Sequence, residues 1–133
     1  MAFLVREALP KPPIKIKEYS IEPSSIKAGK SATITMTIKN VDLKTHEISL
    51  YFKVSPRVII YTGAEQPLPY SDSRYVYTFS MSAEDPTEDR AFTLTATLES
   101  GSSRADYPIV LEVKVDGRII QKNWKDITIT VKS

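Results

Sequence analysis

The stretch from residue 107 to residue 131 decides the fold. It reads Tyr107-Pro-Ile-Val-Leu-Glu-Val-Lys-Val115, then Asp116-Gly117, then nine mostly polar residues, then Ile127-Thr-Ile-Thr-Val131. Apolar residues alternate along both ends, as in strands with one buried face. The Asp-Gly pair supplies the positive φ angles of a tight type I′ turn. The stretch therefore predicts the closing hairpin of an antiparallel β-sandwich, with Tyr107 as a tyrosine that ties a sandwich corner.

The same alternation recurs along the chain. It marks candidate strands at 14–21, 32–39, 48–54, 58–61, 74–81 and 92–98, with turn residues between them. No segment keeps a helical period over three turns. Short alternating strands separated by turns are typical of sandwiches and barrels. We therefore predict an all-β protein: an antiparallel β-sandwich of seven to eight strands over residues 14–133, preceded by an extended N-terminal arm, residues 1–13.

The arm combines an apolar run with prolines. Phe3, Leu4 and Val5 are followed by Pro10-Lys-Pro-Pro13, which forbids a helix and favours an extended conformation. Two interpretations stay open. The arm is a frayed tail, as termini usually are, or its apolar run docks as an added strand on a neighbouring subunit.

Composition excludes several classes. The net charge of +2 is too small to predict nucleic-acid binding, and the longest apolar runs are far too short for a membrane span. The first ten residues are too short and too charged for a signal peptide. As written, the chain is expected in the cytoplasm, or outside the cell or on a virion surface if an anchor was removed or the protein belongs to an assembly. Few Gln and Asn, no Cys and many Lys and Ile favour a thermophile's protein.

Catalytic and cofactor chemistry is not expected. His46 is the only histidine and lies in a polar segment, so we predict a surface-loop histidine and no catalytic residue. Without cysteine, no thiolate or zinc–thiolate site can form. Four carboxylates lie within residues 84–89, where hard oxygen ligands could hold Ca²⁺, but the glycine-supported spacing of calcium loops is missing. We expect no enzyme, no cofactor and no metal, and interpret 84–89 as a solvated loop.

Two groups of residues are candidates for binding. The first is a predicted threonine face on the outward side of two paired strands; the null interpretation is that threonine simply suits a solvated strand. The second is a set of aromatic residues around the middle loop and before the last strand, which suits protein interfaces or carbohydrate stacking. The members are Thr33, Thr35, Thr37, Thr93, Thr95 and Thr97 for the first, and Tyr70, Tyr75 and Trp124 for the second.

Residues 21–40 and the closing hairpin carry a resemblance. Ile21-Glu-Pro, Gly29, the alternating run from Ala32 to Ile38 and Asn40 resemble the CARDB-type domains of bacteria and archaea, which are immunoglobulin-like sandwiches. The chain departs from that pattern after Asn40, where a glycine is usual. Major-sperm-protein-like and archaeal surface-filament sandwiches have similar strand patterns. The resemblance implies an adhesion or interaction module, usually without catalysis.

These observations predict a non-enzymatic protein-interaction or assembly module whose partner is a protein, including a second copy of itself. One alternative is a structural subunit of an archaeal or viral surface assembly, with the arm completing a neighbour's sheet. Another is a carbohydrate-binding module using Tyr70, Tyr75 and Trp124. No nucleic acid is expected as a partner.

Overall fold

The computed structural model describes residues 13–62, 66–82, 84, 86–121 and 126–133. Phe3, Leu4, Val5 and Trp124 lie outside these ranges. The described residues form an all-β fold of twelve strands. These are β1 (Ile14–Glu22), β2 (Ser25–Lys27), β3 (Ser31–Asn40), β4 (His46–Lys53), β5 (Val58–Thr62), β6 (Gln66–Pro67), β7 (Tyr70–Ser71), β8 (Arg74–Met81), β9 (Thr87–Ala96), β10 (Arg104–Val115), β11 (Arg118–Gln121) and β12 (Asp126–Lys132).

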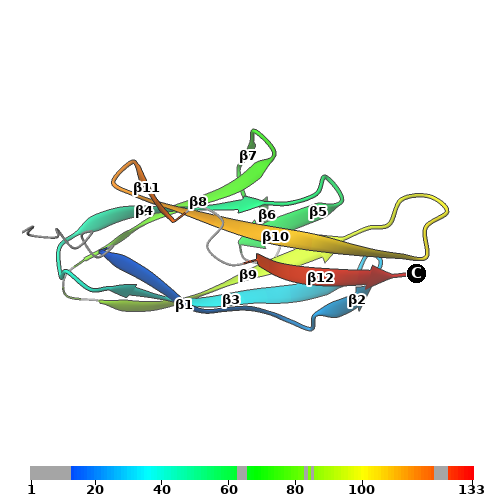
Figure 1. Ribbon diagram of the computed structural model, residues 1–133, viewed down its shortest axis with the longest axis horizontal. Coiled ribbons are helices and arrows are strands. Elements are labelled where there is room, and N and C mark those ends of the chain that lie inside the picture. Colours follow the sequence, from blue (N-terminus) through cyan, green and yellow to red (C-terminus); the bar gives the residue numbers. More distant parts are fainter. Residues whose placement is uncertain (1–12, 63–65, 83, 85, 122–125) are drawn as a thin grey trace, which may run out of the picture.

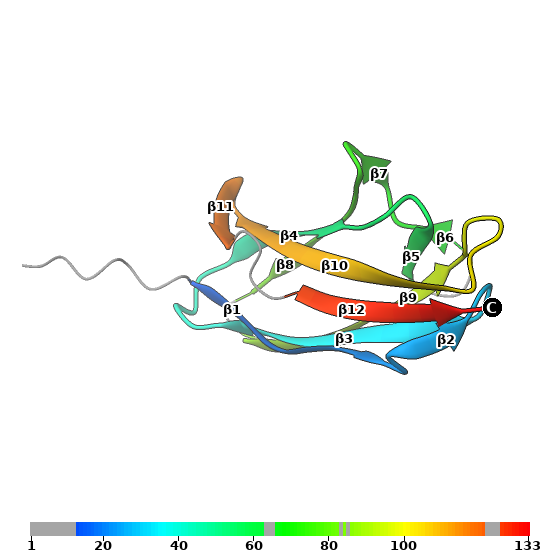
Figure 2. The ribbon, with the colours of Figure 1, turned by 45° about the vertical axis from the view of Figure 1, so that its right-hand side comes forward.

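The strands form two sheets (Figures 1 and 2). One has the order β1-β3-β9-β5-β6, and the other has the order β2-β12-β10-β4-β8-β7, with β11 paired to β10. One of the sheets is curled into a half-barrel. In the described part of the chain no helix is long and apolar enough to cross a membrane.

The core lies between the sheets because each long strand turns its apolar alternate residues inward. Ile34 of β3 and Leu111 of β10 are fully buried and belong to the same hydrophobic cluster. Phe52 of β4 and Phe92 of β9 meet across the core edge-to-face, with ring centroids 5.1 Å apart. On β1, Tyr19 is buried and donates a hydrogen bond to the Ile109 carbonyl of β10, 3.3 Å away. Aromatic contacts and this bond fix the two sheets against each other.

The closing segment is partly as predicted. Asp116 (φ 52°) and Gly117 (φ 80°) both have positive φ, which confirms the tight turn. The Tyr107 hydroxyl donates to the Thr97 carbonyl at 2.8 Å, so this side chain links β10 to the residue that follows β9. The turn, however, joins β10 to the short β11. The closing strand β12 pairs with the first half of β10, from Arg104 to Val110.

Other predictions need correction. The prediction of seven to eight strands counted the long strands and missed the short pieces β2, β6, β7 and β11. The pairing is not wholly antiparallel, because β2 runs parallel to β12. The predicted solvated loop 84–89 is also wrong in part. β9 begins at Thr87, so its acidic residues extend the ladder with β3.

Candidate interaction site

Strand β8 leaves part of one edge without a neighbour. On one side it pairs with β4 along its whole length, from Arg74 to Met81. On the other side β7 reaches only Arg74 and Tyr75, and the Val76 N–H donates to the Pro69 carbonyl at 2.9 Å. Beyond Val76, no described residue pairs with this side of β8. We call residues 77–81 of β8 the free edge.

The backbone groups along the free edge can be assigned from the ladder. In an antiparallel pair, alternate residues direct both their N–H and C=O toward the same neighbour. The Val76 N–H points away from β4, and the β4–β8 register is regular. Thr78 and Ser80 therefore also direct their backbone groups outward. Within the described chain these groups have no protein partner, so they can receive an added strand.

The side chains along the free edge carry no charge. Residues 75–81 read Tyr-Val-Tyr-Thr-Phe-Ser-Met, which is rich in the aromatic and β-branched residues that favour strands. Thr78 and Ser80 are exposed on the outer face, while Tyr77 and Phe79 lie half-buried on the inner face. Long uncharged edges of this kind are the ones that recruit other strands.

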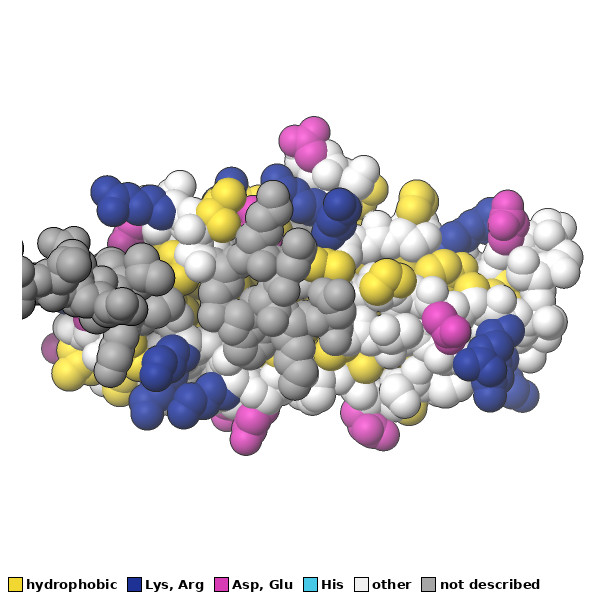
Figure 3. Space-filling view, in the orientation of Figure 1, with side chains coloured by type: hydrophobic (Ala, Val, Ile, Leu, Met, Phe, Trp, Pro, Cys, Tyr) yellow, Lys and Arg dark blue, Asp and Glu magenta, His cyan; other side chains and the backbone are white. Residues whose placement is uncertain are grey.

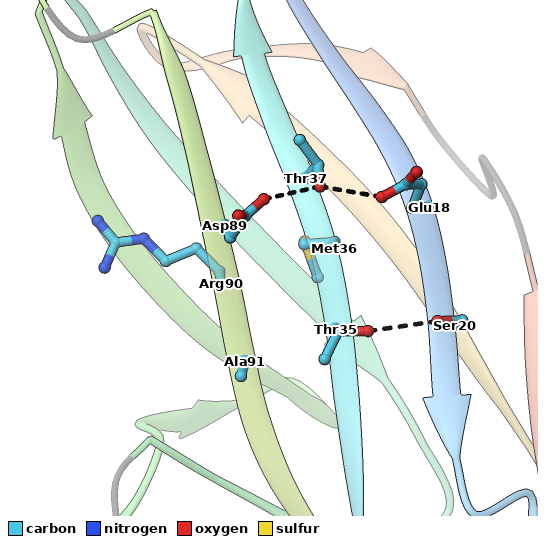
Figure 4. A pocket seen from close by; sticks show the side chains of 8 residues that line it. All are labelled: Glu18, Ser20, Thr35, Met36, Thr37, Asp89, Arg90 and Ala91. Atoms are coloured by element: carbon cyan, nitrogen blue, oxygen red, sulfur yellow. Dashed lines mark hydrogen bonds between the residues drawn. The ribbon is translucent and has the colours of Figure 1, made fainter.

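Arg90 of β9 covers the inner side of the free edge. Its guanidinium carbon lies 4.8 Å from the Phe79 ring centroid and 5.7 Å from that of Tyr77, within the range of cation–π contacts. A salt bridge of 2.6 Å to Glu88 holds it there, and its buried Nε has no hydrogen-bond partner in the described chain. Figure 4 shows the side chain extending from β9 away from Thr37 and Asp89. A charged, half-exposed group thus fills a place between the sheets where the core is otherwise apolar.

The predicted threonine face exists. β3 and β9 pair, with Thr33 directly opposite Thr93 and Ser31 opposite Thr95. Thr97 follows the end of β9 and is exposed. Beside these residues an open groove of ≈ 530 Å³ crosses β1, β3 and β9 (Figure 4). It is lined by Glu18, Ser20, Thr35, Met36, Thr37, Asp89, Arg90 and Ala91.

On the threonine face, the hydroxyl groups of Thr35, Thr37 and Thr95 are hydrogen-bonded within the described chain. Thr37 donates to Asp89 at 2.8 Å, and Thr35 lies 3.3 Å from the Ser20 hydroxyl. Thr95 donates to the Tyr61 hydroxyl at 3.4 Å. These bonds are ordinary cross-strand stabilisation. The role of this face in binding stays a prediction.

The aromatic group is only partly brought together. Tyr70 is 49% exposed and meets Tyr75 edge-to-face, with ring centroids 4.7 Å apart. Tyr75 itself is 8% exposed, and burial raises the pKa of its phenol. A buried ring offers little face to a sugar, so the described members form no flat stacking platform. Carbohydrate binding that includes Trp124 remains a prediction outside the described residues.

His46 is not a solvated loop residue. It begins β4, and its side chain is only 10% exposed. Nδ1 lies 2.6 Å from Asp116 and Nε2 lies 2.8 Å from Asp42, so both ring nitrogens face carboxylates. The bond to Asp116, followed by the bond and charge of Asp42, raises the pKa of His46 against the effect of burial. The His46 ring therefore joins the loop after β3 to the β10–β11 turn.

No described group of carboxylates and histidine has the arrangement of a metal site. Glu88 pairs with Arg90, and Asp89 accepts a bond from Thr37 on the opposite face of β9. The carboxylates of Glu88 and Asp89, which belong to the acidic segment 84–89, therefore point to opposite faces of β9.

Charge on the surface is mixed. On the face drawn in Figure 3, Lys and Arg side chains are interspersed with Asp and Glu, and hydrophobic side chains are scattered between them. This pattern fits the small net charge of the chain.

Comparisons with known proteins give the fold and no family. No protein-family model and no curated protein match the chain. Among solved structures, the alkylpurine DNA glycosylase AlkC of Pseudomonas fluorescens, bound to DNA containing an abasic site analog, aligns with a TM-score of 0.56 at 10% identity. That alignment covers 91% of this chain and 31% of AlkC. The sporulation control protein Spo0M of Bacillus subtilis aligns with a TM-score of 0.45 at 12% identity, over 92% of this chain and 50% of that one.

At such identities the likeness to AlkC supports the all-β fold alone. The chain spans half the length or less of either protein. The resemblance to CARDB-type domains is matched by no family model and stays a prediction.

Sequence reasoning missed the free edge and Arg90. The alternation of Phe92, Leu94 and Ala96, extended backwards, places Arg90 on the inner face of β9. That signal was present in the sequence. The free edge of β8 exists because β7 is too short to pair beyond Val76. No local sequence pattern predicts where β7 ends.

Proposed function

We propose that the protein is a non-enzymatic protein-interaction module that binds an extended segment of a protein partner as a strand added to β8. The observation that carries this proposal is the free edge, with the outward backbone groups of Thr78 and Ser80. Strand addition gives affinity through main-chain hydrogen bonds and specificity through alternate side chains. The inner row of Tyr77 and Phe79 would supply that specificity.

The immunoglobulin-like form of the sandwich is part of the same proposal. It is supported by the pairing of β3 with β9 and by the bond from Tyr107 to Thr97. Domains of this kind present sheet edges and end loops to partners on a rigid core. The role as a subunit of an archaeal or viral surface assembly would use the same edge.

Peptide selection tests the proposal without knowledge of the partner. The full chain and its variants are exposed to a displayed library of random peptides. We expect the full chain, immobilised at low density as separate molecules so that no second copy can fill the edge, to retain peptides with apolar residues at alternate positions, and Thr78→Pro to lose them. Proline removes the outward N–H of residue 78 but leaves the β4 ladder intact, because that N–H does not enter it.

Thr78→Val is the matched control. Like the proline variant it loses the 3.0 Å hydroxyl contact with Ser49, but it keeps the backbone N–H. It should retain the same peptides. A second blocking variant, Thr78→Lys, places a charge on the edge and should also abolish retention. If no peptides distinguish the full chain from both blocking variants, the proposal is wrong.

A further inference from the structure

We propose that the occupant of the free edge is the apolar segment of the N-terminal arm, residues 2–7, from a second copy, and that two chains exchange arms. This inference rests on the proposed function and names its partner. It is carried by the place where the arm leaves the fold and by the chemistry of its residues.

The arm and the free edge belong to the same end of the molecule. The Pro13 carbonyl accepts a hydrogen bond from Val41 N–H at 2.8 Å, and the Asn40 N–H donates to the Pro86 carbonyl at 2.7 Å. Ile14 lies opposite Asn40 in the ladder. The chain before β1 therefore leaves the fold near the connection that follows Met81, where the free edge ends.

This placement favours a closed pair of chains. When donor and acceptor lie at the same end, a twofold axis through that end carries each arm to the other chain's edge. The resulting interface is closed and uses the same surfaces on both chains. Donor and acceptor at opposite ends would instead give an open filament.

The prolines favour a second copy over the chain's own edge. The sequence of the base, with Pro10, Pro12 and Pro13, favours an extended conformation, which would oppose a tight return onto the same fold. Residues 8–12 together span roughly 16 Å when extended, at about 3.3 Å for each residue. That reach is enough to cross from one fold to a neighbour in contact with it.

The chemistry of the segment matches the edge. Residues 2–7 read Ala-Phe-Leu-Val-Arg-Glu, which is long enough to cover the free edge from 77 to 81. As a strand, the segment places Phe3, Val5 and Glu7 on one face. The apolar pair suits the half-buried rings of Tyr77 and Phe79. Glu7 carries the charge opposite to that of Arg90, whose Nε has no partner in the described chain.

Sedimentation velocity of the full chain over a wide concentration range tests the exchange. We expect a dimer that dissociates on dilution. Thr78→Pro, which keeps its donor but loses its acceptor, should be monomeric, with half the mass. Phe3→Asp combined with Val5→Asp, which keeps the acceptor but loses the donor, should be monomeric as well. Thr78→Val should remain a dimer.

Mixing the two monomeric variants gives the decisive result. One intact donor then meets one intact acceptor, so a heterodimer held by a single arm should form, weaker than the original dimer. Dimers that persist in either variant alone, or no heterodimer on mixing, would overturn the inference. A monomeric full chain would overturn it too.

Hydrogen exchange separates the ways in which the inference can fail. If the full chain is monomeric and the amides of Thr78 and Ser80 exchange slowly, but lose that protection in the Phe3→Asp/Val5→Asp variant, the arm pairs with its own edge. If they exchange fast in a monomer while selected peptides still bind, the occupant is another protein. In both cases exchange with a second copy is wrong and the proposed acceptor edge stands. If the selected peptides also fail to bind, both the exchange of arms and the proposed strand-binding edge are wrong.

Discussion

Strands β1 and β8 both lie at the margin of a sheet, yet they are built differently. β1 carries Lys15, Lys17 and Glu18, and its register with β3 shifts between Lys17 and Ser20. Glu18 has a positive φ of 57° at this irregularity. Charges and bulges are devices by which proteins keep edges from pairing with other chains. Residues 75–81 of β8 have no charge and no register shift.

The inner faces of the two marginal strands also differ: the aromatic residue of β1 is fully buried, whereas Tyr77 and Phe79 of β8 are half-buried. At β1, Tyr19 is 1% exposed and reaches across to the Ile109 carbonyl, so the chain closes that margin itself. At β8, the half-buried rings of Tyr77 and Phe79 are covered by Arg90, whose side chain is 32% exposed. A cation on aromatic rings is a weaker cover than packed apolar atoms. One margin is therefore closed by the chain itself, whereas the other keeps backbone groups without a partner in the described residues.

Truncating Tyr19 of β1 and Phe79 of β8 to alanine should give the largest difference between the two margins, measured as the loss in free energy of unfolding. Tyr19→Ala leaves a cavity in a closed core and should lower the free energy of unfolding by about 3–5 kcal/mol. Phe79→Ala removes a half-buried ring and should cost roughly half as much, since less surface returns to water. Urea unfolding of both variants measures this. Equal losses would mean that β8 is as much a part of the core as β1.

Adding a charge to β8, or removing lysines from β1, tests whether edge charges control self-association. Both changes should leave the free energy of unfolding almost unchanged. Thr78→Lys gives β8 the kind of charge that β1 carries, and should abolish self-association with a stability change within about 0.5 kcal/mol. Lys15→Thr combined with Lys17→Thr removes the two lysine charges from β1 and should leave association on β8 unchanged. Light scattering together with urea unfolding checks both. New association through β1 would show that charge, and not the bulge, protects that margin.

The long strands could be predicted from sequence because their signal is local. Alternation from Ala32 to Ile38, or from Ile109 to Val115, states both the strand and its buried face. The turn at Asp116-Gly117 was predictable for the same reason, since its φ angles demand those residues.

Features that depend on neighbours across the fold could not be read in this way. His46 follows a polar segment, and only the meeting of that segment with the β10–β11 turn places Asp42 and Asp116 on either side of it. Thr87 to Arg90 look like a loop because they are charged, yet β3 extends far enough to pair with them. Tertiary context decides such segments over local preference.

His46, Asp42 and Asp116 form a cluster at the end of the free edge, because His46 lies opposite Met81 in the ladder. This cluster should make a moderate contribution to stability that depends on pH. The folded pKa of His46 is raised. Its contribution to stability is therefore complete below the unfolded pKa of about 6.5 and is lost as the pH rises through the folded value. The bonds from His46 and from Glu47 N–H lower the pKa of Asp116, so its contribution disappears as the pH falls.

Asp42 behaves like Asp116: burial raises its pKa, but the bonds from His46 and Lys44 N–H outweigh this and lower it. Thermal unfolding should show the highest melting temperature between the ordinary carboxylate and imidazole ranges. His46→Asn should flatten the fall on the alkaline side. An unchanged profile would mean that the cluster contributes nothing measurable. The protection factor of the Met81 amide, which corrects for the intrinsic rise of exchange with pH, should fall at alkaline pH if the cluster anchors this end of β8.

Replacing Thr35 and Thr95 with lysine should give the smallest effect, and it decides between the free edge and the threonine face. Both side chains lie on the outer face of the sheet, remote from the outward backbone groups of Thr78 and Ser80 in the other sheet. Their bonds to Ser20 and Tyr61 are weak cross-strand contacts, so stability should change by less than about 1 kcal/mol. If β8 is the acceptor, the mass measured by light scattering stays that of the unmodified chain. If the two lysines abolish association, the partner docks on the threonine face and the unpaired edge of β8 is not the binding site.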